Sequence, residues 1–124
     1  MKPLFFSLLM LIASPAWAVW TFVTSDTEGV KVFVDFETLR KEGAIRKVWQ
    51  ISNYPPNNKT LEGSVRSRVE LDCKNETVKT LSFSIFSENF SRGQNIYTQD
   101  AEQEKKSIAP DSVGWTVLKE VCKK

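Results

Sequence analysis

Two cysteines, Cys73 and Cys122, constrain the fold of this 124-residue chain more than any other feature. Cys73 ends a segment in which apolar and polar residues alternate, which is the pattern of a half-buried β-strand. Cys122 ends a segment in which apolar residues recur at the spacing of an amphipathic helix. A disulfide between them would therefore fasten a helix to a sheet, provided that the protein reaches an oxidising compartment.

The N-terminus predicts that the protein does reach such a compartment. Lys2 precedes the apolar run Leu4–Ile12, and the small-x-small triplet Ala16–Ala18 is typical of a signal-peptidase site. The apolar run is shorter than the roughly 20 residues that a transmembrane helix needs. We therefore predict a signal peptide at residues 1–18 and a mature domain at residues 19–124, in the periplasm, at the cell surface or secreted.

Export makes a disulfide the default state of two cysteines, so we expect Cys73 and Cys122 to be bonded. Their wide spacing is unlike a Cys-x-x-Cys redox motif, which favours a structural role. No cysteine lies near the predicted cleavage point, so we expect no attached lipid. The formal net charge is +2, and removal of Lys2 leaves +1. A chain so close to neutral has no general electrostatic reason to bind nucleic acid or anionic lipid.

Six segments have the composition or the alternation of β-strands. The clearest alternation precedes Cys73, where Val65, Val69 and Leu71 share one face while Arg66, Arg68, Glu70 and Asp72 share the other. We expect the first face to be core and the second to be wet. Residues 36–43 predict a short helical turn or loop, and residues 100–106 a solvated connection. The expected strands are residues 19–24, 30–35, 44–54, 65–73, 77–86 and 94–98.

The C-terminal segment has helical spacing instead. Asp111 or Ser112 can cap a helix whose apolar stripe includes Trp115, Leu118 and Val121 together with Cys122. Since Cys122 belongs to the stripe and Cys73 to the apolar face of its strand, the bridge would tie the helix to the inner face of the sheet. The sequence therefore predicts an α+β fold: an antiparallel sheet of about six strands with a C-terminal helix packed on one face and tied to it by a disulfide.

Catalytic chemistry has few candidate residues. The chain has no histidine, and paired cysteines supply no thiolate. Glu70 and Asp72 would lie about 7 Å apart along a strand, a separation that a glycosidase can use. Arg66 and Arg68 on the same face would favour their ionised forms, however, which is wrong for a general acid. We therefore expect no enzyme, no metal and no cofactor, and a carboxylate-dependent hydrolase is only an alternative.

Another acidic pair, Asp35 and Glu37, is expected at a strand end that runs into a capped turn. Two tryptophans of the predicted mature chain, Trp20 and Trp49, are expected in a core or an interface rather than on a ligand platform. Trp115 is expected to pack with the helix stripe.

Basic residues provide a binding hypothesis. Repeated on one strand face and around the turn into an adjacent strand, they could form a positive patch for acidic protein segments or sulfated glycans, and binding would weaken with salt. Local neutralisation by Glu37, Glu42, Glu70 and Asp72 is the preferred alternative. The residues of the hypothetical patch are Arg40, Lys41, Arg46, Lys47, Arg66 and Arg68.

Several short motifs follow one another in an order that carries more information than any one of them. The most specific part of the order is Val48-Trp49 followed by Asp72-Cys73 and then by a late proline segment that leads to Cys122. The motifs are Trp20, Val32–Asp35, Leu39-Arg40, Gly43–Trp49, Asn53-Tyr54, Ser67–Cys73, Ile85–Ser87, Gly93, Ile108–Ser112 and Cys122.

In this order the motifs resemble the surface-adhesin protein E family of small exported bacterial proteins. The resemblance implies an antiparallel sheet with a disulfide-fastened helix, a possible homodimer and adhesion to host matrix or plasma proteins such as laminin, vitronectin and plasminogen. The chain departs from the adhesin pattern because it lacks a lipid-attachment cysteine. A periplasmic binding or inhibitory protein of the cell envelope is therefore the alternative to an adhesin-like protein-binding module.

Overall fold

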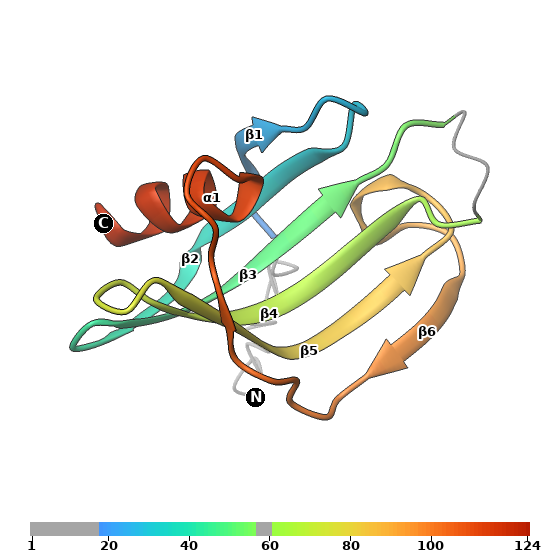
Figure 1. The fold of residues 1–124 in the computed structure, drawn as a ribbon. Coiled ribbons are helices and arrows are strands. Elements are labelled where there is room, and N and C mark those ends of the chain that lie inside the picture. The colour runs from blue at the N-terminus through green and yellow to red at the C-terminus, as the bar shows by residue number, and fades with distance from the viewer. Residues whose placement is uncertain (1–17, 57–60) are drawn as a thin grey trace, which may run out of the picture.

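A computed structural model of the chain describes residues 18–56 and 61–124. Six strands follow one another as an antiparallel meander in chain order (Figure 1). A two-residue strand, β7 (Lys106–Ser107), pairs with β5 beyond this path. The predicted signal peptide, apart from Ala18, lies outside the described residues. The six strands are β1 (Thr21–Ser25), β2 (Lys31–Glu42), β3 (Ile45–Asn53), β4 (Ser64–Asp72), β5 (Thr77–Phe86) and β6 (Asn95–Gln99).

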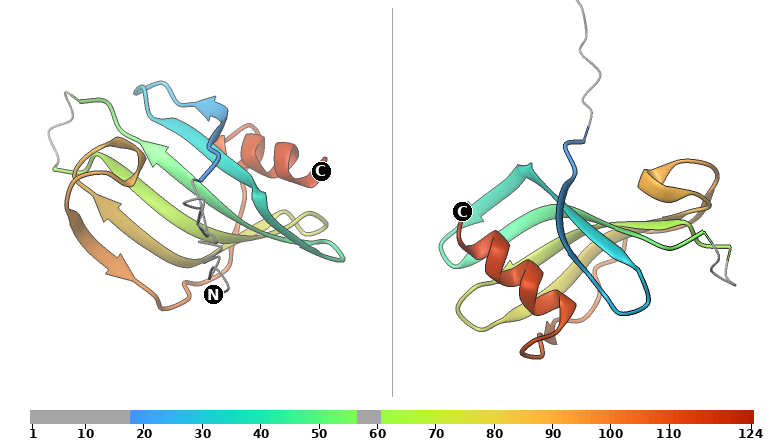
Figure 2. Two further views of the ribbon diagram at one scale, coloured as in Figure 1. Left: turned by 180° about the vertical axis from the view of Figure 1, so that it is seen from behind. Right: turned by 90° about the horizontal axis from the view of Figure 1, so that it is seen from above.

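The predicted C-terminal helix is α1 (Val113–Cys122), and it covers one face of the sheet (Figure 2). Ser112 is its N-cap, because the Ser112 hydroxyl accepts a hydrogen bond of 3.2 Å from the backbone N–H of Trp115. Three buried residues of the helix pack on valine and leucine side chains of β2, β3 and β4. The buried core consists of Val32, Val34, Val48, Val69, Leu71, Ile108, Val117, Leu118 and Val121.

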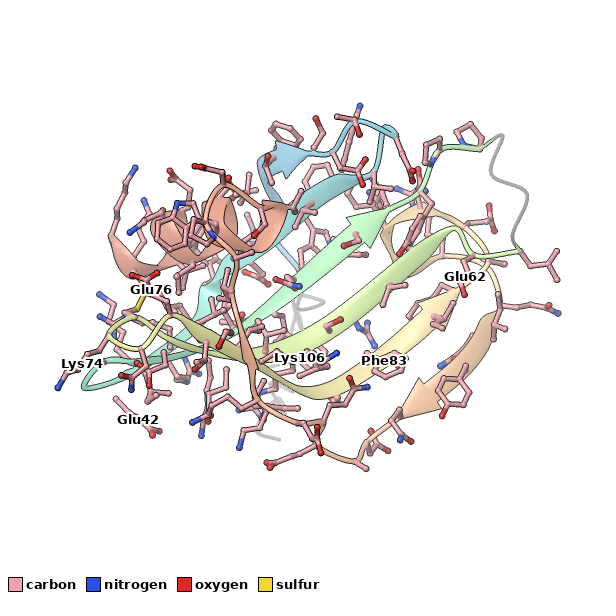
Figure 3. The ribbon with its side chains drawn as sticks, viewed as in Figure 1. Glu42, Glu62, Lys74, Glu76, Phe83 and Lys106 are labelled. Carbon is pink, nitrogen blue, oxygen red and sulfur yellow. A yellow bond between two sulfur atoms is a disulfide. The ribbon has the colours of Figure 1, made fainter. Side chains whose placement is uncertain are left out.

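The predicted disulfide joins Cys73, directly after β4, to Cys122, the last residue of α1. The two Cα atoms are 5.9 Å apart. Figure 3 shows the bond in yellow beside Glu76, where the turn after β4 meets the helix. The α+β architecture predicted from the two periodicities is therefore confirmed.

Residues 36–43 do not form the helical turn that their polarity suggested. β2 continues to Glu42 and contains a long bulge, because Asp35 pairs with Trp49 while the next paired residue, Arg40, is opposite Lys47. The extra residues between Asp35 and Arg40 have no partners in β3, yet Phe36 and Leu39 among them pack against the core. Burial of these two side chains keeps the segment in the sheet.

The sheet face opposite α1, which we call the rear face, is not uniformly wet as expected. Ile51 is 0% exposed and Phe86 is 8% exposed, although neither belongs to the core under the helix. The turn η1 (Asn89–Ser91) folds over this face (Figure 2). The ring of Phe90 in this turn lies 5.1 Å from that of Phe33, centroid to centroid. Both faces of the sheet therefore bury apolar surface, one face under α1 and the rear face under η1.

Two residues of η1 have left-handed backbone conformations, which are unusual for side chains with a Cβ. Phe90 has φ 56° and Ser91 has φ 61°. The backbone N–H of Phe90 donates to Asn53 Oδ1 at 2.9 Å, and that of Ser91 donates to Ser64 Oγ at 3.0 Å. These hydrogen bonds to β3 and β4 hold the turn against the rear face.

Candidate functional site

The six basic residues of the hypothetical patch are divided between the two faces of the sheet. Directly paired residues in adjacent strands share a face. Arg40 pairs with Lys47, whereas Lys41 pairs with Arg46, which in turn pairs with the core residue Leu71. Lys41 and Arg46 therefore belong to the helix side of the sheet.

The other four basic residues share the rear face. Arg68 pairs with Trp49, which is two residues from Lys47 on β3, and Arg66 is two residues from Arg68 on β4. Arg40 joins them as the partner of Lys47. The patch predicted from the sequence is therefore only partly assembled.

Of the four acidic residues expected to neutralise the patch, only Glu70 forms an ion pair within the described residues. Glu70 lies between two lysines, with its carboxylate oxygens 4.0 Å from Lys47 Nζ and 3.7 Å from Lys79 Nζ. Lys79 Nζ is also 3.4 Å from Glu102. Among the described residues, no ion pair includes Arg40 or Arg68, and both side chains are exposed. Within the hypothetical patch, these are the two rear-face residues that are both exposed and outside an ion pair.

Arg66 stacks between two aromatic rings instead of extending into solvent. Its guanidinium carbon lies 5.5 Å from the ring centroid of Trp49 and 5.2 Å from that of Phe86. Such cation–π contacts contribute about 0.5–2 kcal/mol each, with the larger value for desolvated pairs. The Nε of Arg66 is buried and finds no hydrogen-bond partner among the described residues. Arg66 therefore organises the middle of the rear face.

The carboxylates of the alternative hydrolase have structural roles. Asp72 accepts hydrogen bonds of 2.9 Å from the backbone N–H groups of Lys74 and Asn75 and from Asn75 Nδ2. The hydrogen bonds from Asn75 lower the pKa of Asp72, and the hydrogen bond from Lys74 lowers it by a smaller amount. A carboxyl group with a lowered pKa is a poor general acid at neutral pH, which argues against the hydrolase.

A cavity of about 530 Å³ opens beside the β2 bulge on the rear face. The bulge shapes it, because Thr38 Oγ1 donates to the backbone oxygen of Asp35 at 2.7 Å and accepts from the backbone N–H of Trp49 at 3.1 Å. Asp35 Oδ1 accepts from the backbone N–H of Glu37 at 3.1 Å. The residues lining the cavity are Ala18, Trp20, Asp35, Glu37, Thr38, Trp49 and Arg66.

Sequence reasoning did not place these residues together. It assigned Asp35 and Glu37 to a strand end, and Trp20 and Trp49 to a core or interface, but all four line the cavity. The bulge between Asp35 and Arg40 brings the acidic pair beside Trp49. The signal that could have revealed it is the apolar pair Phe36 and Leu39 within an otherwise polar segment, which indicates a strand that continues with altered spacing.

Within residues 18–56 and 61–124, no helix has the length and apolar character required to span a membrane. The same described residues contain no group of three or more histidine, cysteine, aspartate or glutamate residues placed to hold a metal ion.

The meander, the C-terminal helix and the bond between them define a small disulfide-fastened α+β domain with an aromatic and basic rear face. The family profile of surface-adhesin protein E matches residues 20–123. This chain belongs to that family.

Solved structures of Haemophilus influenzae protein E have a similar fold. Crystal form II of that protein is 18% identical, with a TM-score of 0.61 over 86% of this chain and 97% of that one. The selenomethionine form is 16% identical, with a TM-score of 0.62 over 82% of this chain and 85% of that one. Protein E from non-typeable Haemophilus influenzae is 16% identical, with a TM-score of 0.59 over 90% and 82% of the two chains. A search of curated protein sequences finds no match.

Proposed function

We propose that this chain is an exported, non-catalytic module of the adhesin type that binds other proteins through its rear face. The partners proposed are host matrix or plasma proteins such as laminin, vitronectin or plasminogen, met at the cell surface or after secretion. Membership of the surface-adhesin family supports the class of function. The observation that carries the choice of surface is the presence of two exposed arginines, Arg40 and Arg68, beside the half-buried aromatic residue Trp49.

Arginine is suited to this role because its guanidinium group binds carboxylates and sulfates through two parallel hydrogen bonds. Aromatic residues near such arginines supply the apolar area on which binding energy commonly concentrates. An acidic segment of a partner would meet Arg40 and Arg68, while Glu70 would hold the neighbouring lysines in place. Because the two arginines are exposed, this attraction should be screened by salt.

The register offers a matched test. Arg40 and Lys41 are adjacent and both exposed, but they belong to opposite faces of the sheet. We expect the double variant Arg40→Glu/Arg68→Glu to bind laminin or vitronectin about tenfold more weakly than the wild type at low salt, and the difference to shrink as salt rises. Surface plasmon resonance at several salt concentrations would measure this.

The control variant Lys41→Glu reverses one charge on the helix side and should bind as the wild type does. Arg66 is left intact, because its removal would also disturb the ring stack with Trp49 and Phe86. Equal binding by the wild type and the double variant would reject the rear face as the binding surface.

A further inference from the structure

The cavity beside the β2 bulge contains a buried carboxylate that the described residues satisfy only in part. Asp35 is 4% exposed. Its Oδ1 accepts a hydrogen bond from the backbone N–H of Glu37, but no hydrogen bond from a described residue reaches Oδ2. No described basic side chain forms an ion pair with Asp35. Oδ2 is not among the fully enclosed side-chain atoms that lack a partner, and Asp35 lines the cavity, so Oδ2 has room for one further donor from the open side.

The charged residues that line this cavity favour a cation. Two carboxylates, Asp35 and Glu37, line it against one guanidinium group, that of Arg66. Arg66 is already engaged by the rings of Trp49 and Phe86, and its Nε is enclosed. The lining therefore carries an excess of negative charge, and neither carboxylate forms an ion pair with a described basic side chain.

The remaining walls suit the apolar stem of such a cation. Trp20 and Trp49 line the cavity, and neither belongs to the core under α1. Indole rings pack against methylene groups and attract a cation placed over the ring face. A volume of about 530 Å³ is sufficient for a side chain of the size of lysine or arginine.

We propose that this cavity binds the ammonium or guanidinium group of a lysine or arginine side chain of a partner protein. Asp35 and Glu37 receive the charged group, and Trp20 and Trp49 hold its stem. The inference deepens the proposed function and rests on it only in taking the cation from a protein. Cleavage after Ala18, as predicted, would remove one lining residue and leave the other six.

Small capped amino acids test the cavity without any matrix protein. The full chain is expressed in a bacterial host that exports it, and it is purified with its disulfide intact. Mass spectrometry identifies the N-terminal residue of the purified protein. N-acetyl-arginine methylamide and N-acetyl-lysine methylamide are titrated while the indole N–H signals of Trp20 and Trp49 are followed by NMR. We expect saturable shifts with a Kd of about 1 mM. The neutral isostere N-acetyl-citrulline methylamide should give no saturable shift.

Putrescine distinguishes a free amine from a protein side chain as the source of the cation. Tighter binding of the capped amino acids than of putrescine supports a protein partner. Tighter binding of putrescine would overturn that assignment.

Two substitutions test the carboxylates. Asp35→Asn keeps the oxygen that accepts from Glu37 N–H but removes the charge, and we expect about tenfold weaker binding of the arginine probe. Glu37→Gln should weaken binding by a smaller factor, because this residue is exposed. Glu42→Gln is the control, since Glu42 is exposed at the far end of β2 and should change nothing. Circular dichroism checks that each variant is folded.

Unsaturable shifts with both cationic probes would overturn the inference. Equal binding of the citrulline probe, or unchanged binding by Asp35→Asn and Glu37→Gln, would do the same. Probe binding that persists when laminin and vitronectin fail to bind would reject the proposed function alone. Matrix-protein binding without probe binding would reject the cavity alone.

Discussion

The role of each charged residue on the sheet depends on its place in the register. Arg40 and Lys41 are neighbours along the chain, but their partners in β3 place them on opposite faces. Glu70 is held by two lysines, whereas Asp72, two residues later, is committed to the turn after β4. Alternation along a strand predicted the shared face of Arg66 and Arg68 correctly. It could not predict which of the other cations would join them, because the register across strands is set by the bulge.

The hydrogen bonds that lower the pKa of Asp72 make a prediction about pH. A group whose folded pKa lies below its unfolded pKa stabilises the folded state above the unfolded pKa and loses that contribution as pH falls through the folded pKa. We therefore expect Asp72 to contribute to stability at neutral pH and to lose that contribution below about pH 4, the ordinary aspartate pKa. Asp72→Asn should lower the melting temperature at pH 7 and reduce its further fall on acidification.

Thermal unfolding followed between neutral and acidic pH would measure this effect. Asp100→Asn is the matched control, because Asp100 is exposed and outside the strands and accepts no hydrogen bond from a described side chain. If the melting temperatures of the wild type and Asp72→Asn fell by the same amount as the pH is lowered, the prediction would be wrong.

At the scale of an element, β2 shows how a local irregularity creates a site. A regular strand would have placed Glu37 and Thr38 opposite successive residues of β3. Instead, the bulge removes them from the ladder, and Thr38 replaces the lost pairing by bonding to the backbone of Asp35 and Trp49. Residues 36–43 suggested a helical turn or loop because the segment is mostly polar and its apolar and polar residues do not alternate. Phe36 and Leu39, which are partly buried against the core, and the Thr38 hydrogen bonds together keep the segment in the strand.

The Thr38 hydroxyl should therefore carry much of the stability of the bulge. Thr38→Val keeps the shape of the side chain but leaves the Trp49 N–H without its acceptor, and we expect a loss of about 1–3 kcal/mol in the free energy of unfolding. Thr38→Ser keeps the hydroxyl and should cost less. Urea denaturation of both variants would compare them, and equal midpoints would show that the hydroxyl is dispensable.

At the scale of the whole molecule, one disulfide links the helix to the end of β4 and adds to the packing between helix and sheet. α1 is short, and an isolated helix of this length is marginal in water. Its buried residues, its N-cap at Ser112 and the bond from Cys122 to Cys73 together keep it on the sheet. Since the bonded residues are separated by 49 positions, the link also restricts the unfolded chain strongly.

Removal of the link should be severe for a domain of this size. We expect the double variant Cys73→Ser/Cys122→Ser to lose about 4 kcal/mol of unfolding free energy, from the entropy of closing a loop of this length. Urea denaturation of the oxidised wild type, the reduced wild type and the double variant would measure the loss. The reduced wild type and the double variant should have the same free energy of unfolding. A reduced wild type as stable as the oxidised one would contradict the prediction.

The sequence alone determined the architecture, because the strand before Cys73 and the helix before Cys122 each have a periodicity that their own residues set. The two cysteines lie on the apolar sides of these elements, so a bond between them places the helix on the inner face of the sheet. The tertiary structure decided which residues share a face and line the cavity, on which both proposals depend. The β2 bulge, the division of the basic residues between two faces and the cavity around Asp35 all depend on which residues of β3 and β4 lie opposite β2. Register across strands is fixed by side chains that pack from distant parts of the chain, and no local pattern contains that information.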